Sequence, residues 1–135
     1  MHTHLRIARP VSDVARAQAM YCAGLGLRVV GRFNDAEPEG FEGVMLGSEG
    51  CGYHFEFTLC RGHAVAPAPT AEDLLVFYLP DAAQWRSACA RILAAGFVEV
   101  DAFNPYWAER GRSFADPDGY RVVLENDAWS NGDQA

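Results

Sequence analysis

Apolar and polar positions follow the same order twice along this chain of 135 residues. Pro10 to Gly26 and Pro80 to Gly96 each combine the end of a strand, a helix with a polar residue before it, and a glycine stop. The second segment begins 70 positions after the first. A unit that occurs twice predicts two modules with the same succession of elements.

The first copy predicts a strand, a helix and three further strands. Leu5 and Ile7 alternate with other residues, as is typical of a half-buried strand. Ser12 is a suitable N-cap, and apolar residues then recur at helical spacing until Gly26. The three strands are expected near residues 28–33, 43–46 and 53–59, with a polar loop at 34–40 between the first two.

The second copy predicts the same elements. An apolar run at 74–79 indicates its first strand, and Asp81 and Gln84 have the spacing of a capping box before an amphipathic helix. The remaining strands are expected near residues 97–100, 112–114 and 120–125, with turn residues at 116–119 before the last.

We therefore expect an α+β fold of two tandem βαβββ modules, whose curved mixed sheets form a cup with the helices on its outer face. The small, proline-bearing segment between the copies is typical of a connector. The predicted boundaries are a single domain at residues 1–130, with module one at 3–60, a linker at 61–72 and module two at 73–126, followed by a flexible tail at 127–135.

Composition narrows the choice of partners. Half of the residues are hydrophobic, which is enough for a substantial core. The formal net charge of −7 opposes binding to nucleic-acid phosphates. No apolar run approaches the roughly 20 residues of a membrane-spanning helix, and the first residues lack the apolar core of a signal peptide. We expect a cytoplasmic protein that binds neither nucleic acid nor membranes, with four cysteines that act as small hydrophobic residues.

Three segments carry a resemblance to a known family. They are His4-Leu5-Arg6-Ile7-Ala8, Tyr21 with Leu25-Gly26, and Phe114-Ala115-Asp116-Pro117-Asp118-Gly119-Tyr120. Over roughly residues 3–126 the chain resembles the vicinal oxygen chelate superfamily, which includes glyoxalases, bleomycin and fosfomycin resistance proteins, and extradiol dioxygenases. The resemblance implies the two-module fold, but many different chemistries share that scaffold.

The resemblance implies half of a metal site. In metal-dependent members the first strand of each module supplies His or Gln, and the last strand supplies a Glu four residues after the turn glycine. His4 and Glu56 occupy these positions in module one. Leu74 and Val123 occupy them in module two and cannot donate to a metal. A divalent ion such as Zn, Ni, Mn or Fe would therefore find its ligands on one side.

Strand alternation places His54 on the same face as Glu56, so two interpretations of this face stay open. His4, His54 and Glu56 have the chemistry of a site with two histidines and one carboxylate, although His54 lies about 7 Å from Glu56 along the strand. Alternatively, Glu56 is a buried acid that pairs with His4 or Arg6. Arg121 and Glu125 would pair in the same way in module two.

Two functions follow from these alternatives. The first is a metal-free cup that binds a small oxygenated organic molecule. The second is a metal-dependent lyase or dioxygenase that uses His4 and Glu56. Between them lies a metal-free enzyme in which Glu56 and His54 are the catalytic acid and base.

The aromatic segment at 103–107 would form one wall of the ligand site, or pack on the sheet edge or in a dimer contact. The acidic chain with this aromatic segment is compatible with a homodimer. The side chains expected to contact a ligand are Arg6, Tyr78, Tyr106, Trp107, Arg121 and Glu125.

Overall fold

The computed structural model describes residues 3–132 of the chain. It divides into two compact units, one up to residue 66 and the other from residue 67 on. The predicted linker at 61–72 contains this division. We keep the names module one and module two for these units. The predicted tail at 127–135 forms no helix or strand over residues 127–132, and the rest of it lies outside the described residues.

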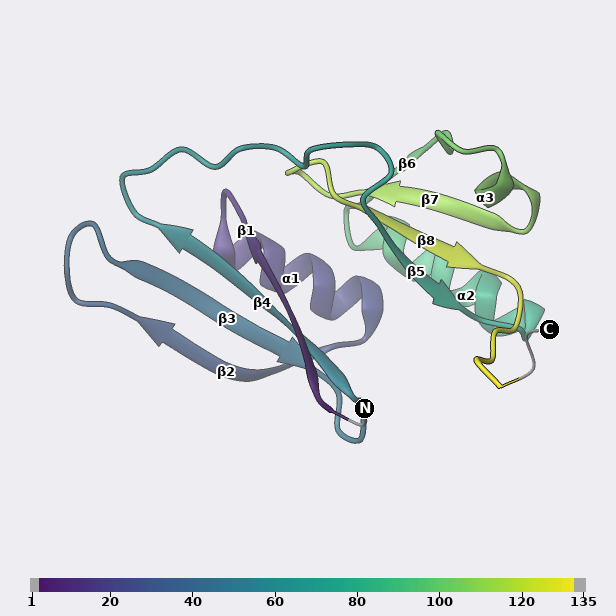
Figure 1. The fold of residues 1–135 in the computed structure, drawn as a ribbon, viewed down its shortest axis with the longest axis horizontal. Helices are drawn as coiled ribbons and strands as arrows, with labels where there is room; N and C mark the ends of the chain where they lie inside the picture. Colours follow the sequence, from purple (N-terminus) through teal and green to yellow (C-terminus); the bar gives the residue numbers. More distant parts are fainter. Residues whose placement is uncertain (1–2, 133–135) are drawn as a thin grey trace. The chain divides into compact units, whose positions relative to one another are not determined.

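Module one is a four-stranded mixed sheet with one helix against a single face (Figure 1). The strand order is β1-β4-β3-β2, in which β1 runs parallel to β4 and the other pairs are antiparallel. The elements are β1 (Leu5–Pro10), α1 (Val14–Leu25), β2 (Arg28–Asn34), β3 (Phe41–Gly47) and β4 (Tyr53–Cys60).

The alternation of β4 determines what each face of this sheet carries. Phe55 and Phe57 are fully buried, and the ring of Tyr21 on α1 lies 4.6 Å from that of Phe57. Burial of such aromatic rings supplies a large share of the stability of a small module. Because side chains alternate along a strand, His54 and Glu56 lie on the face opposite α1.

The ends of both helices follow simple capping rules. Asp13, rather than the predicted Ser12, caps α1, because its carboxylate accepts a hydrogen bond from the backbone N–H of Arg16 at 3.0 Å. Gly26 ends α1 as predicted, with a φ of 69° that favours glycine. In module two, Asp81 caps the helix as predicted and accepts from the N–H of the third residue beyond it at 2.9 Å.

Module two repeats the topology of module one. Its strand order is β5-β8-β7-β6, with β5 parallel to β8, and α2 covers one face of the sheet (Figure 1). The ring N–H of Trp85 on α2 donates to the carbonyl of Leu124 at 2.8 Å. The elements are β5 (Leu74–Tyr78), α2 (Ala82–Ala94), β6 (Val98–Val100), α3 (Tyr106–Glu109), β7 (Gly111–Ala115) and β8 (Arg121–Glu125). The predicted α+β fold of two βαβββ modules is confirmed.

The short helix α3 begins within the aromatic segment at 103–107 that stands out in the sequence. Asn104 initiates it: its side-chain oxygen accepts from the N–H of Tyr106 at 3.0 Å, and its carbonyl accepts from the N–H of Trp107 at 3.1 Å. Four residues are too few to show a helical period in the sequence.

Within the described range, no helix is both long and apolar enough to cross a membrane.

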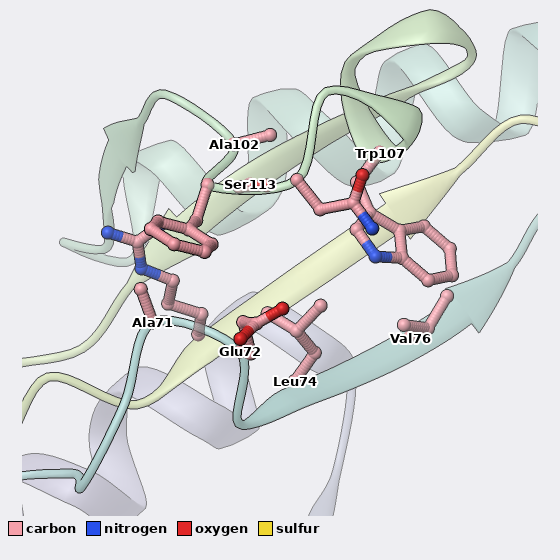
Figure 2. Close-up of a pocket in the computed structure, with 10 residues that line it drawn as sticks. Ala71, Glu72, Leu74, Val76, Ala102, Trp107 and Ser113 are labelled. Atoms are coloured by element: carbon pink, nitrogen blue, oxygen red, sulfur yellow. The ribbon is translucent and has the colours of Figure 1, made fainter.

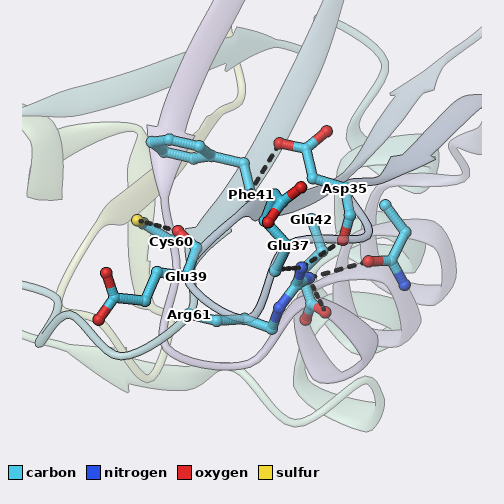
Figure 3. A network of polar contacts seen from close by, with 8 residues as sticks. Asp35, Glu37, Glu39, Phe41, Glu42, Cys60 and Arg61 are labelled. Carbon is cyan, nitrogen blue, oxygen red and sulfur yellow. Dashed lines mark hydrogen bonds and ion pairs between the residues drawn. The ribbon is translucent and has the colours of Figure 1, made fainter.

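Arg61, directly after β4, holds the loop between β2 and β3. Its guanidinium donates to the carbonyls of Asp35 and Glu37 and, at 2.8 Å, to the side-chain oxygen of Asn34 (Figure 3). The carboxylate of Glu42 lies 3.5 Å away. The predicted linker begins at Arg61, but these contacts attach this residue to module one.

We expect Arg61→Met to lower the free energy of unfolding by about 2 kcal/mol, because loop oxygens lose a charged donor. Arg61→Lys keeps the positive charge but not the planar set of guanidinium donors, so its free energy of unfolding should fall by less than that of Arg61→Met. Arg28→Met, at an exposed position of the same sheet, is the control. Urea unfolding measures all three variants. A loss below about 0.5 kcal/mol for Arg61→Met would contradict the role given to Arg61.

Candidate functional site

Four polar side chains form a continuous hydrogen-bonded series on the face of module one opposite α1. His4 Nε2 lies 2.6 Å from His54 Nδ1. Arg6 Nε donates to His54 Nε2 at 2.8 Å, and Arg6 Nη1 donates to Glu56 Oε2 at 2.9 Å. We call this series the Arg6 chain. It forms because the parallel pairing of β1 with β4 sets Arg6 opposite His54 and Ala8 opposite Glu56.

The donors and acceptors of the Arg6 chain determine the ring protons. A guanidinium can only donate, so His54 Nε2 must accept from it. The proton of the neutral His54 ring therefore lies on Nδ1 and is donated to Nε2 of His4. Consequently His4 Nε2, His54 Nε2 and Glu56 Oε2 each use a lone pair within the chain.

The electrostatics agree with this assignment. Partial burial lowers the pKa of His54 below its ordinary value, and the charges of Arg6 and His4 act in the same direction, whereas Glu56 opposes them. His54 is therefore neutral at neutral pH. Opposite charges remain on Arg6 and Glu56, whose side chains are 49% and 17% exposed. Such a solvated ion pair contributes little to stability. It matters for the site because it determines which atoms of Glu56 and His54 accept hydrogen bonds.

Module two has a cavity of about 310 Å³ on one face of its sheet (Figure 2). Leu74 and Val76 of β5 line it together with Ser113 of β7, and Trp107 of α3 lies beside Val76. The other lining residues are Ala71, Glu72, Ala102, Phe103, Asn104 and Arg121. A cavity lined by both apolar and polar side chains can serve as a small-molecule site, and this one lies at the small end of the usual range of volumes.

The structure separates the side chains that the sequence groups as ligand contacts in module two. Trp107 and Arg121 line the cavity, and an Arg121 N–H donates to the carbonyl of Asp101 at 3.1 Å. Tyr106 is half-exposed with its ring 4.9 Å from that of Trp107, and the ring of Tyr78 lies 6.0 Å from that of Trp129. Neither tyrosine is among the lining residues.

Several lining residues carry no functional signal in the sequence. Ser113 has a small polar side chain within a strand, and Asn104 is a common turn residue. Leu74 enters the sequence analysis only as the module-two equivalent of His4, and Val76 is one residue of an apolar run. The feature that could have found them is strand pairing, because Leu74 lies opposite Arg121 in the parallel register.

Glu125 is buried on the same face of β8 as Arg121 and is only 3% exposed. Among residues 3–132 its Oε1 has no hydrogen-bond partner, and the carboxyl lies against Gly111, where the Cβ of any other residue would collide with it. The predicted pair between Arg121 and Glu125 does not form, since Arg121 bonds to the carbonyl of Asp101 instead.

The surroundings of Glu125 favour its neutral form. Burial raises the pKa of its carboxyl, and the negative charges of Asp127 and Glu109 raise it further, while Arg110 opposes them. Tyr78, opposite Glu125 on β5, is affected by the same environment: burial, Tyr106 and Glu125 raise the pKa of its phenol.

Comparisons with known proteins agree with the two-module organisation. The YycE-like N-terminal domain model matches residues 5–58, and the YycE-like C-terminal domain model matches residues 72–126. The uncharacterized protein YycE of Bacillus subtilis is 38% identical over 128 residues, which is 95% of this chain and 91% of that protein. The chain belongs to the YycE-like family.

Solved structures place the YycE-like chain in a wider group. A crystal structure of YycE from Bacillus subtilis has a TM-score of 0.86 at 37% identity, and the match covers 97% of this chain and 94% of that one. Glyoxalase I of Leishmania major gives 0.71 at 20% identity over 94% and 88% of the two chains. FosX of Mesorhizobium loti gives 0.70 at 13% over 91% and 90%. The fold is that of the vicinal oxygen chelate superfamily, as the sequence predicts.

The donor set of this YycE-like chain does not fit the metal that the superfamily implies. A divalent ion held by protein usually has at least three side-chain ligands. Among residues 3–132, no group of three or more His, Cys, Asp and Glu side chains is arranged to hold an ion. The lone pairs of His4 and Glu56 accept hydrogen bonds within the Arg6 chain.

The raised pKa of Glu125 predicts a specific dependence of stability on pH. A folded pKa above the unfolded value gives stability that is complete below the unfolded pKa and is lost as the pH rises through the folded pKa. Glu125→Gln cannot ionise, so its stability relative to the wild type should increase from pH 4 upward. Each unit by which folding raises the pKa adds about 1.4 kcal/mol to this difference.

Urea unfolding between pH 4 and pH 8 measures this dependence. Glu49→Gln, at an exposed position of module one, is the control and should follow the wild-type profile. Parallel profiles for Glu125→Gln and the wild type would show that Glu125 ionises equally in the folded and unfolded states.

Proposed function

We propose that this protein binds a small oxygenated organic molecule in the cavity of module two, without the help of a metal ion. The observation that supports the proposal is the composition of the cavity. Its apolar walls include Leu74, Val76 and Trp107, and its polar groups include the guanidinium of Arg121. Such a mixed lining matches a compact molecule with a flat apolar part and an oxygen-bearing end.

The polar end of such a ligand has a natural partner in Arg121. A guanidinium offers five N–H donors in a fixed plane, and one of those of Arg121 binds the carbonyl of Asp101. Other donors remain for a carboxylate or a similar oxygen pair. The indole of Trp107 supplies the apolar contact. An aromatic ring whose oxygen-bearing group contacts Arg121, away from the carboxylate of Glu72 that also lines the cavity, therefore has suitable chemistry.

The alternative function, a metal-dependent lyase or dioxygenase that uses His4 and Glu56, has less support. Both residues have the sequence positions that it requires, but His4 Nε2 and Glu56 Oε2 each accept a hydrogen bond within the Arg6 chain. Acid–base catalysis by His54 and Glu56 has a similar difficulty, because both ring nitrogens of His54 are in hydrogen bonds. Catalysis, a homodimer and a cytoplasmic location stay predictions.

Benzoate and benzyl alcohol test the proposal, because they share a ring and differ in charge. We expect both to bind to the wild-type protein and to raise its melting temperature. Trp107→Ala should weaken both by about tenfold or more, which corresponds to about 1.4 kcal/mol. Arg121→Gln should weaken benzoate to the same extent and leave benzyl alcohol almost unchanged, since the alcohol carries no charge. Isothermal titration calorimetry measures the dissociation constants.

Two controls accompany this experiment. Trp129→Phe changes an exposed aromatic residue that is not among the lining residues, so the dissociation constants should not change. Dialysis against EDTA should also leave them unchanged. If neither compound binds to the wild type, or if binding survives both Trp107→Ala and Arg121→Gln, the cavity is not the ligand site.

A further inference from the structure

The guanidinium of Arg6 lies between two groups that are common ligands of divalent metals. Its Nε donates to the imidazole of His54 at 2.8 Å, and its Nη1 donates to the carboxylate of Glu56 at 2.9 Å. The two acceptors are two residues apart on β4, so they project from the same face. One cation thus neutralises the carboxylate and uses the lone pair of the imidazole.

The same acceptor atoms would serve a metal ion. Neutral imidazole nitrogen and carboxylate oxygen suit Zn and Ni, and His54 Nε2 carries no proton in the Arg6 chain. A third nitrogen is close by, because His4 Nε2 lies 2.6 Å from the other nitrogen of the His54 ring. A turn of these two rings would free His4 Nε2 as well.

Arg6 prevents this coordination in two ways. It occupies the Nε2 lone pair of His54 and one lone pair of Glu56 Oε2, and it places a guanidinium charge, which is permanent in proteins, between these two groups. A divalent ion would have to displace the guanidinium or lie beside a like charge. The pairing of β1 with β4 keeps Arg6 in register with His54.

We propose that the Arg6 guanidinium stands in for a metal ion, and that His54, Glu56 and the neighbouring His4 form a latent site for Ni²⁺ or Zn²⁺ that opens when this guanidinium is removed. The inference goes beyond the proposed function, because it concerns module one and is independent of an organic ligand in module two. It also explains why His4, His54 and Glu56 are not arranged to hold a metal ion although His4 and Glu56 occupy the superfamily positions.

The test is a gain of metal binding on substitution. Protein without a purification tag is titrated with NiCl₂ and with ZnCl₂, and the bound metal is measured by equilibrium dialysis and elemental analysis. We expect Arg6→Ala to bind one Ni²⁺ per chain with a dissociation constant at least tenfold below that of the wild type. Arg6→Met keeps most of the side-chain length and should also bind Ni²⁺ more tightly than the wild type. It provides the test if the alanine variant does not fold.

Double variants locate the ion. Arg6→Ala with His54→Gln and Arg6→Ala with Glu56→Gln should both lose the gain, and Arg6→Ala with His4→Gln should lose part of it. Arg32→Ala is the matched control, because Arg32 belongs to the same sheet but bonds to Gln18, so it should bind as the wild type does. Tight binding to the wild type with Arg6 intact, or a gain that survives loss of both His54 and Glu56, would overturn the proposal.

Discussion

Within each module the first strand pairs in parallel with the last, and the rest of the chemistry depends on this pairing. In module one it sets Arg6 opposite His54 and Ala8 opposite Glu56, so side chains about 50 residues apart in sequence form one hydrogen-bonded series. In module two it sets Leu74 opposite Arg121. Because alternate residues share a face, the same register that buries Phe55 and Phe57 under α1 presents His54 and Glu56 on the other side.

The two copies use this common register for different purposes. In module one the sheet face opposite α1 is polar, and its charged and uncharged groups form hydrogen bonds with one another in the Arg6 chain. In module two, aliphatic side chains stand at Leu74 and Val76, where such pairing is not available, and a cavity lies over them. The two modules thus share one strand order although the sheet faces opposite their helices carry different side chains.

The sequence was sufficient for the fold but only in part for the site. Capping residues, glycine stops and strand alternation depend on neighbours along the chain, so residues such as Asp81 and Gly26 are enough to predict the βαβββ order. The sequence predicts His4 or Arg6 as the partner of Glu56, and in the structure the partner is Arg6. The choice between two such partners depends on how side chains are oriented on neighbouring strands, and a local sequence pattern does not contain this information. For the same reason the expected pair of Arg121 and Glu125 does not form.

Glu125 places a carboxyl in module two at two residues beyond the superfamily carboxylate position. The superfamily carboxylate position is occupied by Val123, which is fully buried, and a carboxyl appears two residues later on the same face. There it lies against Gly111, and its Oε1 has no partner in the part of the chain that the structure describes. Burial of a charged carboxylate without a partner is costly, so the neutral acid is favoured. The carboxyl of Glu125 therefore protonates more readily than an exposed one, and in its protonated form it can donate a hydrogen bond.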